Sequence, residues 1–399
     1  MTFTAAEGLS AGGVPHRVLV VHPAMAPYRT DLFNLLARRL TLRVLFLQAV
    51  PPYDTNLRRE DLADSLECDW SVAADRCRRP AWALPTRLPR EVAAFQPDAL
   101  VTHEFGWASG LSTMTPLAGR RAARVLWTTR STGQFDRLSS LRRMAVRLMG
   151  RRADAMLAYS AASRVRLASV AGVPEASIFV CANHQDAVRL RRLANEGRAT
   201  VAAQCRQAGL LDRPLVVTVG RLVAAKDIAT TIRGFAAAAD VTSDAALVIV
   251  GDGPLRADLE QLAREVSVRD RVVFVGHVST AETQGWLAAA SVTVLASLAE
   301  PFGAVVAEGL AHGAPCLCST AAGAAVLIDT PARGATFAAG DVAAVAAALR
   351  SRAGGFRPAS ELAASDRPDL RPLTVGDDAN GFCAAIDHAV AARGRRRGS

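Results

Sequence analysis

The sequence is poor in aromatic residues, and it lacks any pair of cysteines at the spacing of a zinc site. Phe, Trp and Tyr make up only 5% of the 399 residues, too few for the stacking platforms that bind single-stranded nucleic acid. The seven cysteines are scattered and include no Cys-x2-Cys pair, so neither a disulfide framework nor a zinc site is indicated. We therefore expect no nucleic-acid partner, no metal site and a reducing compartment.

The sequence also lacks an unbroken apolar run long enough to span a membrane. Residues 309–328 carry no charge, but Gly313, Pro315 and Gly323 interrupt them, so we interpret this stretch as helix, turn, strand and turn. Residues 1–15 have neither a basic start nor an apolar centre, which indicates a flexible lead-in rather than a signal peptide. These absences favour a cytoplasmic protein.

Arginine, by contrast, is abundant and gives the chain a formal net charge of +10. This charge favours an anionic partner such as a phosphate or an acidic membrane face, and a coding bias toward arginine and alanine explains it equally well. Half of the residues are apolar and 21% are charged, which is a globular composition. A chain of this length exceeds one hydrophobic core, so we expect two domains.

Short β-rich runs alternate with helical runs, and this pattern starts twice. The runs lie at 16–23, 41–48, 98–105, 124–131, 155–161 and 178–183, and then at 214–220, 246–253, 271–278, 291–297, 314–320 and 335–340. The alternation predicts an α/β protein with two facing, Rossmann-like, doubly wound parallel sheets. We expect domains over 16–190 and 214–375, a connection over 191–213, and a terminal helix with a basic tail over 376–399. Such sheets bind ligands at the carboxyl ends of their strands.

One strand end carries two basic residues. The run "VTVG" ends at Gly220 and is followed by Arg221 and, five residues later, by Lys226. A glycine lets the backbone turn beneath a ligand, a guanidinium holds phosphate oxygens in pairs, and an ammonium adds a point charge. The three residues suit a diphosphate; the alternative is a pair of solvated basic side chains on a loop.

Two further strand ends in the second half carry glycines. "VIVGDGP" contains Gly251-x-Gly253, but Arg256 stands where a dinucleotide fingerprint has its third glycine, so we interpret it as a tight turn before a helix. In "VFVGHV", Gly276 can bring backbone groups against a flat ring, and His277 offers backbone groups rather than a catalytic imidazole.

The stretch "EPFGAVVAEGLAHGAP" places two carboxylates in an apolar neighbourhood. Pro301 restricts Glu300 to an extended conformation, so a helix is expected to follow and to end near Gly313. Glu308 lies seven residues beyond Pro301, about 10 Å along that helix. The backbone amides between the two carboxylates belong to Phe302, Gly303 and Ala304.

These amides and the helix dipole favour an anion at the helix start. A separation of about 10 Å is too wide for the carboxylates of a retaining glycosidase, but it fits a ligand with hydroxyl groups on either side of a diphosphate. The combination of Glu300, Glu308, Arg221 and Lys226 therefore predicts a nucleotide-sugar site. Capping residues and an exposed glutamate are the alternative for either carboxylate alone.

The second half resembles the donor domain of retaining nucleotide-sugar glycosyltransferases with the GT-B fold, family 4. The resemblance rests on "VGRLVAAK", "VIVGDGP", "VVFVGHV", the Glu-x7-Glu motif and "GATFAAGDVAAVAAAL", and it covers about 140 consecutive residues. It implies two Rossmann-like domains and a C-terminal helix that crosses back to the first domain. It also implies transfer with retention and without a metal or other cofactor, and the chain has no Asp-x-Asp motif.

The resemblance assigns a role to each motif residue. It implies that Arg221 and Lys226 bind the donor phosphates, that Glu300 contacts the donor sugar, and that Glu308 holds the ribose. The same resemblance implies that a further group lies near the donor: Gly220, Gly276, His277, Phe302, Gly303 and Ala304.

The first half resembles the family less closely. The "VHPAMAPYRTDLFNLLARR" stretch stands where many members carry a Gly-Gly pair, and it resembles a "PYR…LFN" variant of transferases that act in bacterial surface-glycan or natural-product synthesis. His103 in "VTHEFG" matches the active-site histidine of the family, with Glu104 beside it. Three more residues are expected on the acceptor side of the site: Tyr28, Arg29 and Arg130.

Residues 137–152 form a basic stretch with apolar residues at helical spacing. Such a helix either lies on an anionic membrane, which suits a lipid-linked acceptor, or packs its apolar stripe inward. We favour inward packing of Leu138, Leu141, Met144, Ala145 and Leu148.

We predict a cytoplasmic enzyme, either free or peripheral on the inner face of the membrane, that transfers a hexose-type sugar from a nucleoside diphosphate to a hydroxyl acceptor with retention. The acceptor is either a lipid-linked glycan or a small natural product. Two alternatives stay open: a nucleotide-sugar epimerase on the same scaffold, and a non-catalytic nucleotide-sugar-binding partner protein.

Overall fold

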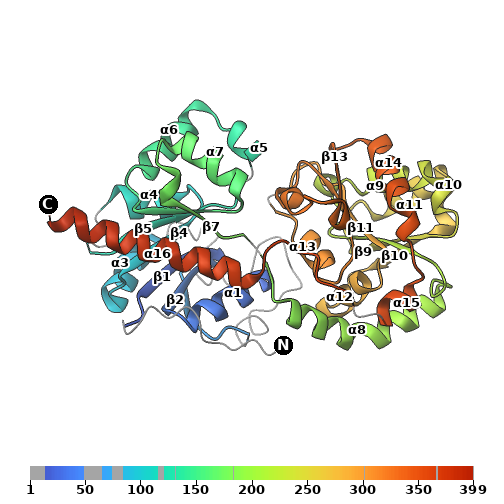
Figure 1. Cartoon of the computed structure of the whole chain (residues 1–399), viewed down its shortest axis with the longest axis horizontal. Coiled ribbons are helices and arrows are strands. Elements are labelled where there is room, and N and C mark those ends of the chain that lie inside the picture. Colours follow the sequence, from blue (N-terminus) through green and yellow to red (C-terminus); the bar gives the residue numbers. More distant parts are fainter. Residues whose placement is uncertain are drawn as a thin grey trace. The chain divides into compact units, whose positions relative to one another are not determined.

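The computed structural model describes residues 14–48, 65–73, 84–115, 121–130, 132–182, 184–300, 302–364 and 367–398. The chain divides into two compact units, the first formed by Met1–Asn183 with Val375–Ser399 and the second by His184–Thr374. Each unit is a parallel sheet flanked by helices (Figure 1). Within the described residues, no helix is both long enough and apolar enough to cross a bilayer.

The first unit contains a seven-stranded parallel sheet in the order β3-β2-β1-β4-β5-β6-β7. Its strands are β1 (Arg17–Ala24), β2 (Thr41–Gln48), β3 (Asp69–Val72), β4 (Ala99–His103), β5 (Ala123–Trp127), β6 (Ala155–Ala158) and β7 (Ile178–Val180). Its helices are α1 (Pro27–Ala37), α3 (Leu84–Phe95), α4 (Trp107–Met114), α5 (Thr132–Asp136), α6 (Ser140–Gly150), α7 (Ala161–Ala171) and α16 (Val375–Gly398). The strand order reverses direction between β1 and β4.

The second unit contains a six-stranded parallel sheet in the order β10-β9-β8-β11-β12-β13. Its strands are β8 (Leu215–Val219), β9 (Ala246–Val250), β10 (Val272–Gly276), β11 (Val292–Leu295), β12 (Cys316–Ser319) and β13 (Gly334–Phe337). Its helices are α8 (Ala187–Gln207), α9 (Ile228–Ala237), α10 (Ala239–Thr242), α11 (Arg256–Glu265), α12 (Thr280–Ala288), α13 (Ala304–Ala311), α14 (Val342–Arg352) and α15 (Ala359–Ala364). Here the order reverses between β8 and β11.

The expected strands are present in both sheets, and β3 is an additional strand that the sequence did not predict. The apolar runs form strands because both faces of a parallel sheet are covered by helices, and Val18 to Val21 are accordingly buried. β3 is a four-residue edge strand, and only Val72 of its residues is buried. Such a short, polar edge strand has no apolar run to reveal it.

Helix α16 returns the C-terminal end of the chain to the first unit. Phe382 and Ile386 are fully buried against that unit, and burial of each contributes about 2 kcal/mol or more. Gly381 permits the close crossing, since a Cβ there would lie 1.8 Å from the carbonyl oxygen of Val180 on β7. The backbone amide of Ala182 donates to the carboxylate of Asp378 at 2.8 Å.

Residues 191–213, expected to connect the two domains, belong to the second unit. Most of them lie in α8, which packs along α12. The two helices approach closely at Gly197, where a Cβ would lie 2.3 Å from the carbonyl oxygen of Ala281. The sequence did not reveal this packing because α8 is polar and basic on its outer face. The unit therefore begins at His184 rather than after an independent connection.

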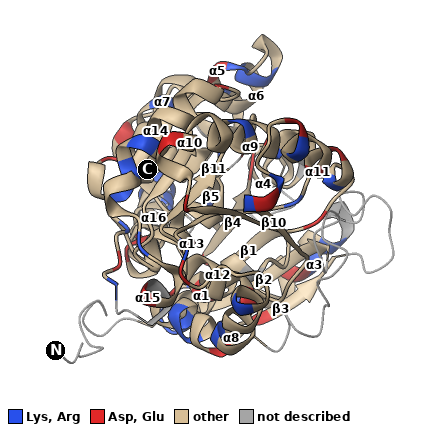
Figure 2. Ribbon diagram, turned by 90° about the vertical axis from the view of Figure 1, so that its right-hand side faces the viewer, with Lys and Arg blue, Asp and Glu red and all other residues tan. Residues whose placement is uncertain are grey.

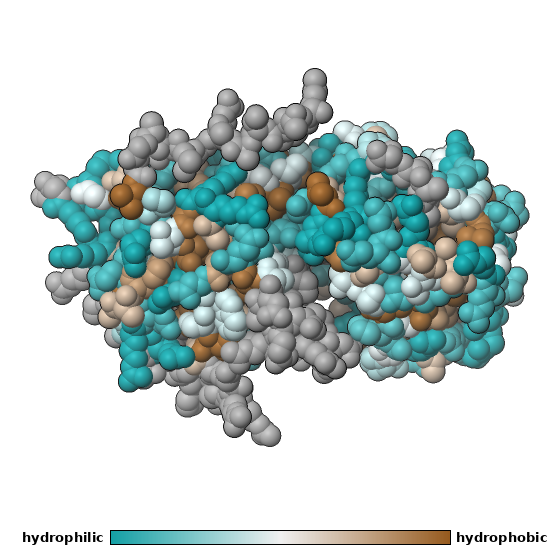
Figure 3. All heavy atoms as spheres, turned by 90° about the horizontal axis from the view of Figure 1, so that it is seen from below, coloured by the Kyte–Doolittle hydropathy of each residue, from teal (hydrophilic) through white to brown (hydrophobic). Residues whose placement is uncertain are grey.

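Charged residues lie mainly on the surface helices of each unit (Figure 2). On the face drawn in Figure 3, hydrophobic residues are scattered among hydrophilic ones. Helix α6 differs from the expectation that its apolar stripe packs inward. Leu138 is buried, but Leu141, Met144 and Leu148 are 71%, 53% and 41% exposed. The helix instead packs through Val146 and Met149.

Candidate functional site

The point of reversal in the second sheet brings together the loops after β8 and β11. Open α/β sheets bind ligands at such a point. The Nζ atom of Lys226, in the loop after β8, forms an ion pair with the Oε2 atom of Glu300, in the loop after β11. The backbone amide of Leu298 donates to the carbonyl of Ala225 at 2.9 Å, which fixes one loop against the other.

The loop after β8 begins at Gly220, whose φ of 154° few other residues adopt. The glycines of "VIVGDGP" pack against this loop, since a Cβ on Gly251 would lie 2.1 Å from the carbonyl oxygen of Gly220. A Cβ on Gly253 would similarly lie 2.6 Å from the carbonyl oxygen of Leu222. The Gly-x-Gly pair therefore allows two loops to approach. Arg221, the second predicted phosphate ligand, is exposed at the start of the loop.

Helix α13 begins at Ala304, with Gly303 as its N-cap and Phe302 buried before it. Gly303 has a φ of 94°, and a Cβ there would lie 2.5 Å from Cδ2 of Leu295. Glycine is required at this position for both reasons. The helix N-terminus next to Lys226 provides a positive partial charge, which favours an anion.

The helix start corrects the expected position of Glu308. Because α13 begins at Ala304 rather than at Pro301, Glu308 lies about 6 Å along the helix instead of about 10 Å. Pro301 itself lies outside the described residues. The expected helix end is confirmed: His312 is the C-cap and Gly313 follows with a φ of 71°.

Glu308 is held by a residue that no sequence motif singled out. Its carboxylate accepts a hydrogen bond of 2.5 Å from Nε2 of Gln185. Burial raises the pKa of Glu308, while hydrogen bonds from Gln185 and Gln284 and the charge of Arg189 act in the opposite direction. Arg189 also donates to Oε1 of Gln185 at 2.9 Å. Gln185 lies in "ANHQD", in which no pattern indicated a contact to Glu308.

Gly276 and His277 lie at the end of β10. Gly276 is buried with a φ of 84°, and its carbonyl accepts from the amide of Gly251 at 2.8 Å. His277 is exposed. This placement leaves the imidazole of His277 at the surface of the second unit.

In the first unit, His103 lies at the end of β4, next to the reversal between β1 and β4. Its ring centroid lies 4.8 Å from that of His22 on β1 and 5.4 Å from that of Trp127 on β5. Both ring nitrogens are buried without a hydrogen-bond partner. Burial, followed by the charge of Arg29, lowers the pKa of His103 to about 3. The imidazole is therefore neutral near pH 7.

Glu104 follows His103 in a left-handed conformation, with a φ of 59°. Its carboxylate accepts hydrogen bonds of 2.7 Å from the backbone amide and 2.5 Å from the hydroxyl of Thr129. The guanidinium of Arg130 lies 3.2 Å from the same carboxylate. Glu104 and Arg130, both expected on the acceptor side, thus pair with each other and join the ends of β4 and β5.

Arg29 is only 1% exposed and anchors the strand ends from within the first unit. It donates to the carbonyl of Ala182 at 3.1 Å and to the hydroxyl of Tyr159 at 2.6 Å. Its guanidinium carbon lies 4.2 Å from the ring centroid of Trp127, a cation–π contact. The side chain of Tyr28, by contrast, is partly exposed.

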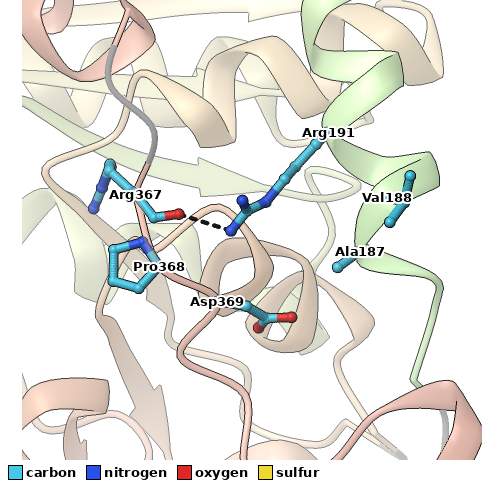
Figure 4. Close-up of a pocket in the computed structure, with 6 residues that line it drawn as sticks. All are labelled: Ala187, Val188, Arg191, Arg367, Pro368 and Asp369. Atoms are coloured by element: carbon cyan, nitrogen blue, oxygen red, sulfur yellow. Dashed lines mark hydrogen bonds between the residues drawn. The ribbon is translucent and has the colours of Figure 1, made fainter. Parts of the chain in front are cut away.

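A pocket of about 430 Å³ in the second unit lies apart from these predicted residues. Figure 4 shows residues from the first turns of α8 facing a segment that follows α15. Arg191 donates to the carbonyl of Arg367 at 2.7 Å across this pocket. Within the described part of the chain, no three His, Cys, Asp or Glu side chains gather as a metal site.

Two family models match the chain and together cover most of its length. The model of Glycosyltransferase Family 4 matches residues 4–189, and the model of Glycosyl transferases group 1 matches residues 213–352. The boundary between the two matches lies close to the boundary between the two units.

Relatives match different shares of the chain. A GDP-mannose-dependent α-(1-6)-phosphatidylinositol monomannoside mannosyltransferase of Mycolicibacterium smegmatis is 30% identical over 66% of this chain and 70% of its own length. The α-D-kanosaminyltransferase of Streptomyces kanamyceticus is 27% identical over 81% of each chain. The lipopolysaccharide core biosynthesis glycosyltransferase LpsD of Rhizobium meliloti is 35% identical, but the match spans only 52% of that protein.

Solved structures share the fold at low sequence identity. Anabaena HepE in complex with UDP-glucose has a TM-score of 0.67 and 18% identity, and the match covers 93% of this chain and 99% of HepE. WaaG, a glycosyltransferase involved in lipopolysaccharide biosynthesis, has a TM-score of 0.59 and 15% identity, with 91% of this chain and 98% of WaaG covered.

Proposed function

The chain belongs to glycosyltransferase family 4 and has the GT-B fold, and on that premise we propose that it transfers a hexose-type sugar from a nucleoside diphosphate to a hydroxyl acceptor with retention. The observation that carries this proposal is the pairing of Lys226 with Glu300 at the reversal point of the second sheet. This pair places an ammonium and a carboxylate beside a helix N-terminus, which suits a donor with an anionic and a hydroxyl-bearing part.

The names of the relatives support the choice of substrate class. They describe a mannosyltransferase that depends on GDP-mannose, a kanosaminyltransferase and a lipopolysaccharide core transferase. These names support our proposal of a sugar nucleotide as donor and of surface-glycan or natural-product synthesis as the pathway class. The acceptor in our proposal is correspondingly a lipid-linked glycan or a small natural product.

In the proposed donor complex, Arg221 and Lys226 bind the diphosphate together with the first amides of α13. When the diphosphate binds, it replaces the carboxylate of Glu300 as the anionic partner of Lys226. Glu300 is then free to accept hydrogen bonds from the sugar hydroxyls. Glu308, held by Gln185, accepts from the ribose diol. Backbone groups near Gly276 and His277 contact the base. No metal is required in this scheme, because the basic side chains and helix amides carry the charge stabilisation.

The proposed reaction forms one bond and breaks one bond at the anomeric carbon. The acceptor oxygen attacks the face from which the diphosphate departs, so the configuration is retained. The acceptor proton passes to an oxygen of the leaving diphosphate. Arg221, Lys226 and the amides of Gly303 and Ala304 stabilise the charge that develops on that group. This stabilisation is the largest contribution in most such reactions.

His103 is the candidate on the acceptor side. Buried polar atoms nearly always have hydrogen-bond partners, and both ring nitrogens of His103 lack one. A hydroxyl group of a substrate would satisfy one of them, and the low pKa of His103 keeps the ring neutral, so that its unprotonated nitrogen can accept such a bond. We propose His103 as a catalytic residue that orients the reacting sugar or acceptor.

The first test is isothermal titration of the protein with UDP, GDP, ADP and dTDP, alongside the Arg221→Ala variant. We expect one nucleotide to bind, and its binding to fall at least tenfold in the variant. The matching nucleotide sugars are then incubated with and without candidate acceptors, and the anomeric configuration of any product is read by NMR. Absence of nucleotide binding in folded protein would overturn the donor site. Conversion of the donor to an isomeric nucleotide sugar without acceptor would identify an epimerase instead.

A further inference from the structure

Helix α6 exposes an apolar stripe to solvent. Leu141, Met144 and Leu148 lie at positions i, i+3 and i+7, on one side of the helix, and are 71%, 53% and 41% exposed. Met114, at the end of the neighbouring α4, is 47% exposed. These side chains expose to water an apolar surface that a packed helix would bury.

A groove between α4 and α6 continues this stripe. Its volume is about 410 Å³, and α4 and α6 pack together beside it. Two glycines of the groove, Gly106 and Gly110, face open space, since a Cβ on either would meet no atom within 4 Å. The groove is lined by apolar residues and these glycines: Phe105, Gly106, Gly110, Met114, Ala145, Leu148 and Met149.

The residues around the stripe carry positive charge and no negative charge. Residues 137–153 contain six arginines and no acidic residue, and Figure 2 shows basic residues on α6. The nearest preceding acid, Asp136, is paired with Arg166 of α7 at 2.7 Å. Arg143 and Arg147 donate to backbone carbonyls rather than to carboxylates, so their charge is not neutralised by their hydrogen bonds.

We propose that α6 and the α4–α6 groove dock onto an anionic lipid bilayer. The exposed apolar side chains of α6 enter the boundary between headgroups and acyl chains, and the flanking arginines contact the anionic headgroups. The stripe is apolar, and residues 137–153 around it carry arginines but no acidic residue. This combination matches the apolar boundary and the anionic headgroups of such a bilayer.

The groove begins two residues after His103, at Phe105. Docking through this surface therefore brings the bilayer close to the strand ends of the first unit. This inference rests on the proposed function only where it links the docked surface to a lipid-linked acceptor. The docking itself does not require nucleotide or transfer, and the two are tested by separate measurements.

The test is co-sedimentation of the full chain with vesicles of phosphatidylcholine alone and of phosphatidylcholine with an equal amount of phosphatidylglycerol. We expect binding to the anionic vesicles only, and a fall in that binding at high salt. The triple variant Leu141→Gln/Met144→Gln/Leu148→Gln should bind anionic vesicles at least tenfold more weakly. Equal binding of the variant and the parent protein would overturn the proposal, as would equal binding to both vesicle types.

A matched control distinguishes an effect of the α6 surface from a general effect of removing an exposed apolar side chain. Val188 on α8 of the second unit is 75% exposed, close to the exposure of Leu141, so Val188→Gln should leave vesicle binding unchanged while Leu141→Gln weakens it. For the charges, Arg142→Glu/Arg151→Glu should abolish the preference for anionic vesicles, while Arg206→Glu/Arg233→Glu in the second unit should not. A uniform effect of all these variants would overturn the assignment to α6.

Two further measurements distinguish lipid docking from loss of fold and from self-association. Thermal unfolding of each variant, followed by circular dichroism, reports the first unit as well as the second, so unchanged transitions show that the unit containing α6 is folded. Sedimentation velocity without lipid reports self-association. If the triple variant converts a dimer to a monomer and the parent protein does not bind vesicles, the surface is a contact between copies of this chain and the lipid proposal is wrong.

Discussion

At the residue scale, the pairing of Lys226 with Glu300 is the feature with the clearest functional consequence. Both side chains are mostly buried, with exposures of 25% and 14%, so their interaction is less screened than that of a surface pair. The carboxylate neutralises the ammonium when no donor is bound. Substitutions on the two sides of the pair should therefore have opposite effects on nucleotide binding.

Glu300→Gln is expected to strengthen nucleoside diphosphate binding a few-fold, because the ammonium of Lys226 loses its internal counter-charge. The same substitution should lower the rate of sugar transfer about a hundredfold, since the carboxylate no longer binds the sugar. Lys226→Met should instead weaken nucleotide binding about tenfold to a hundredfold. Isothermal titration measures the affinities, and Arg233→Met on α9 serves as the control. Weaker binding in both variants would contradict the proposed exchange of partners at Lys226.

At the scale of elements, α13 depends on one glycine at its start. Gly303→Ala forces a side chain into a left-handed conformation and against Leu295. We expect the free energy of unfolding of the second unit to fall by about 1 to 3 kcal/mol. Urea denaturation followed by circular dichroism measures the change. Gly354→Ala, where a Cβ would meet nothing within 4 Å, is the matched control and should change stability by less than about 0.5 kcal/mol.

Helix α16 is a second element with a specific requirement. Phe382 is fully buried, and its ring lies 5.7 Å from that of Trp127 at the end of β5. Phe382→Ala should destabilise the first unit by about 3 to 5 kcal/mol, because it removes apolar contacts and leaves a cavity. Asp387→Ala on the exposed side of the same helix should cost less than about 1 kcal/mol. If both variants unfold at the same denaturant concentration as the parent protein, α16 does not contribute to the core as described.

At the scale of the whole molecule, buried neutral histidines make stability depend on pH. Burial is the first cause that lowers the pKa of His103 to about 3 and of His312 to about 4, and it also lowers the pKa of His22. In the unfolded chain these groups bind a proton near pH 6.5. Between about pH 6.5 and 4 the unfolded state therefore binds more protons, so the free energy of unfolding falls as pH falls through this window.

Calorimetry at pH 7.5 and pH 5 measures this loss. We expect a lower melting temperature at pH 5, with His312 alone contributing about 2 kcal/mol to the change. His312→Gln should reduce the loss in the second unit, because glutamine does not titrate and still donates to Gln284, the present partner of His312. His277→Gln, at an exposed position, is the control. Equal melting temperatures at the two pH values would contradict the burial of neutral imidazoles.

Much of the architecture was predictable from local pattern. The apolar runs located the strands of the second sheet to within a few residues, because a strand buried on both faces has a continuous apolar signature. The same sequence indicated that Glu300 precedes a helix that ends near Gly313. It did not locate β3, and it gave the start of α13 as Pro301 rather than Ala304.

The composition and the order of strands in the sequence thus established the α/β class, the two-domain organisation, and the residue types at each strand end. Tertiary structure alone decided which of those ends meet. Lys226 contacts Glu300 because β8 and β11 are neighbours in the sheet, although 74 residues separate the two side chains. The contact of Gln185 with Glu308, the burial of Arg29 and the exposure of the α6 stripe depend in the same way on long-range packing. Local periodicity tells which residues share a face, but only the neighbouring elements determine what covers that face.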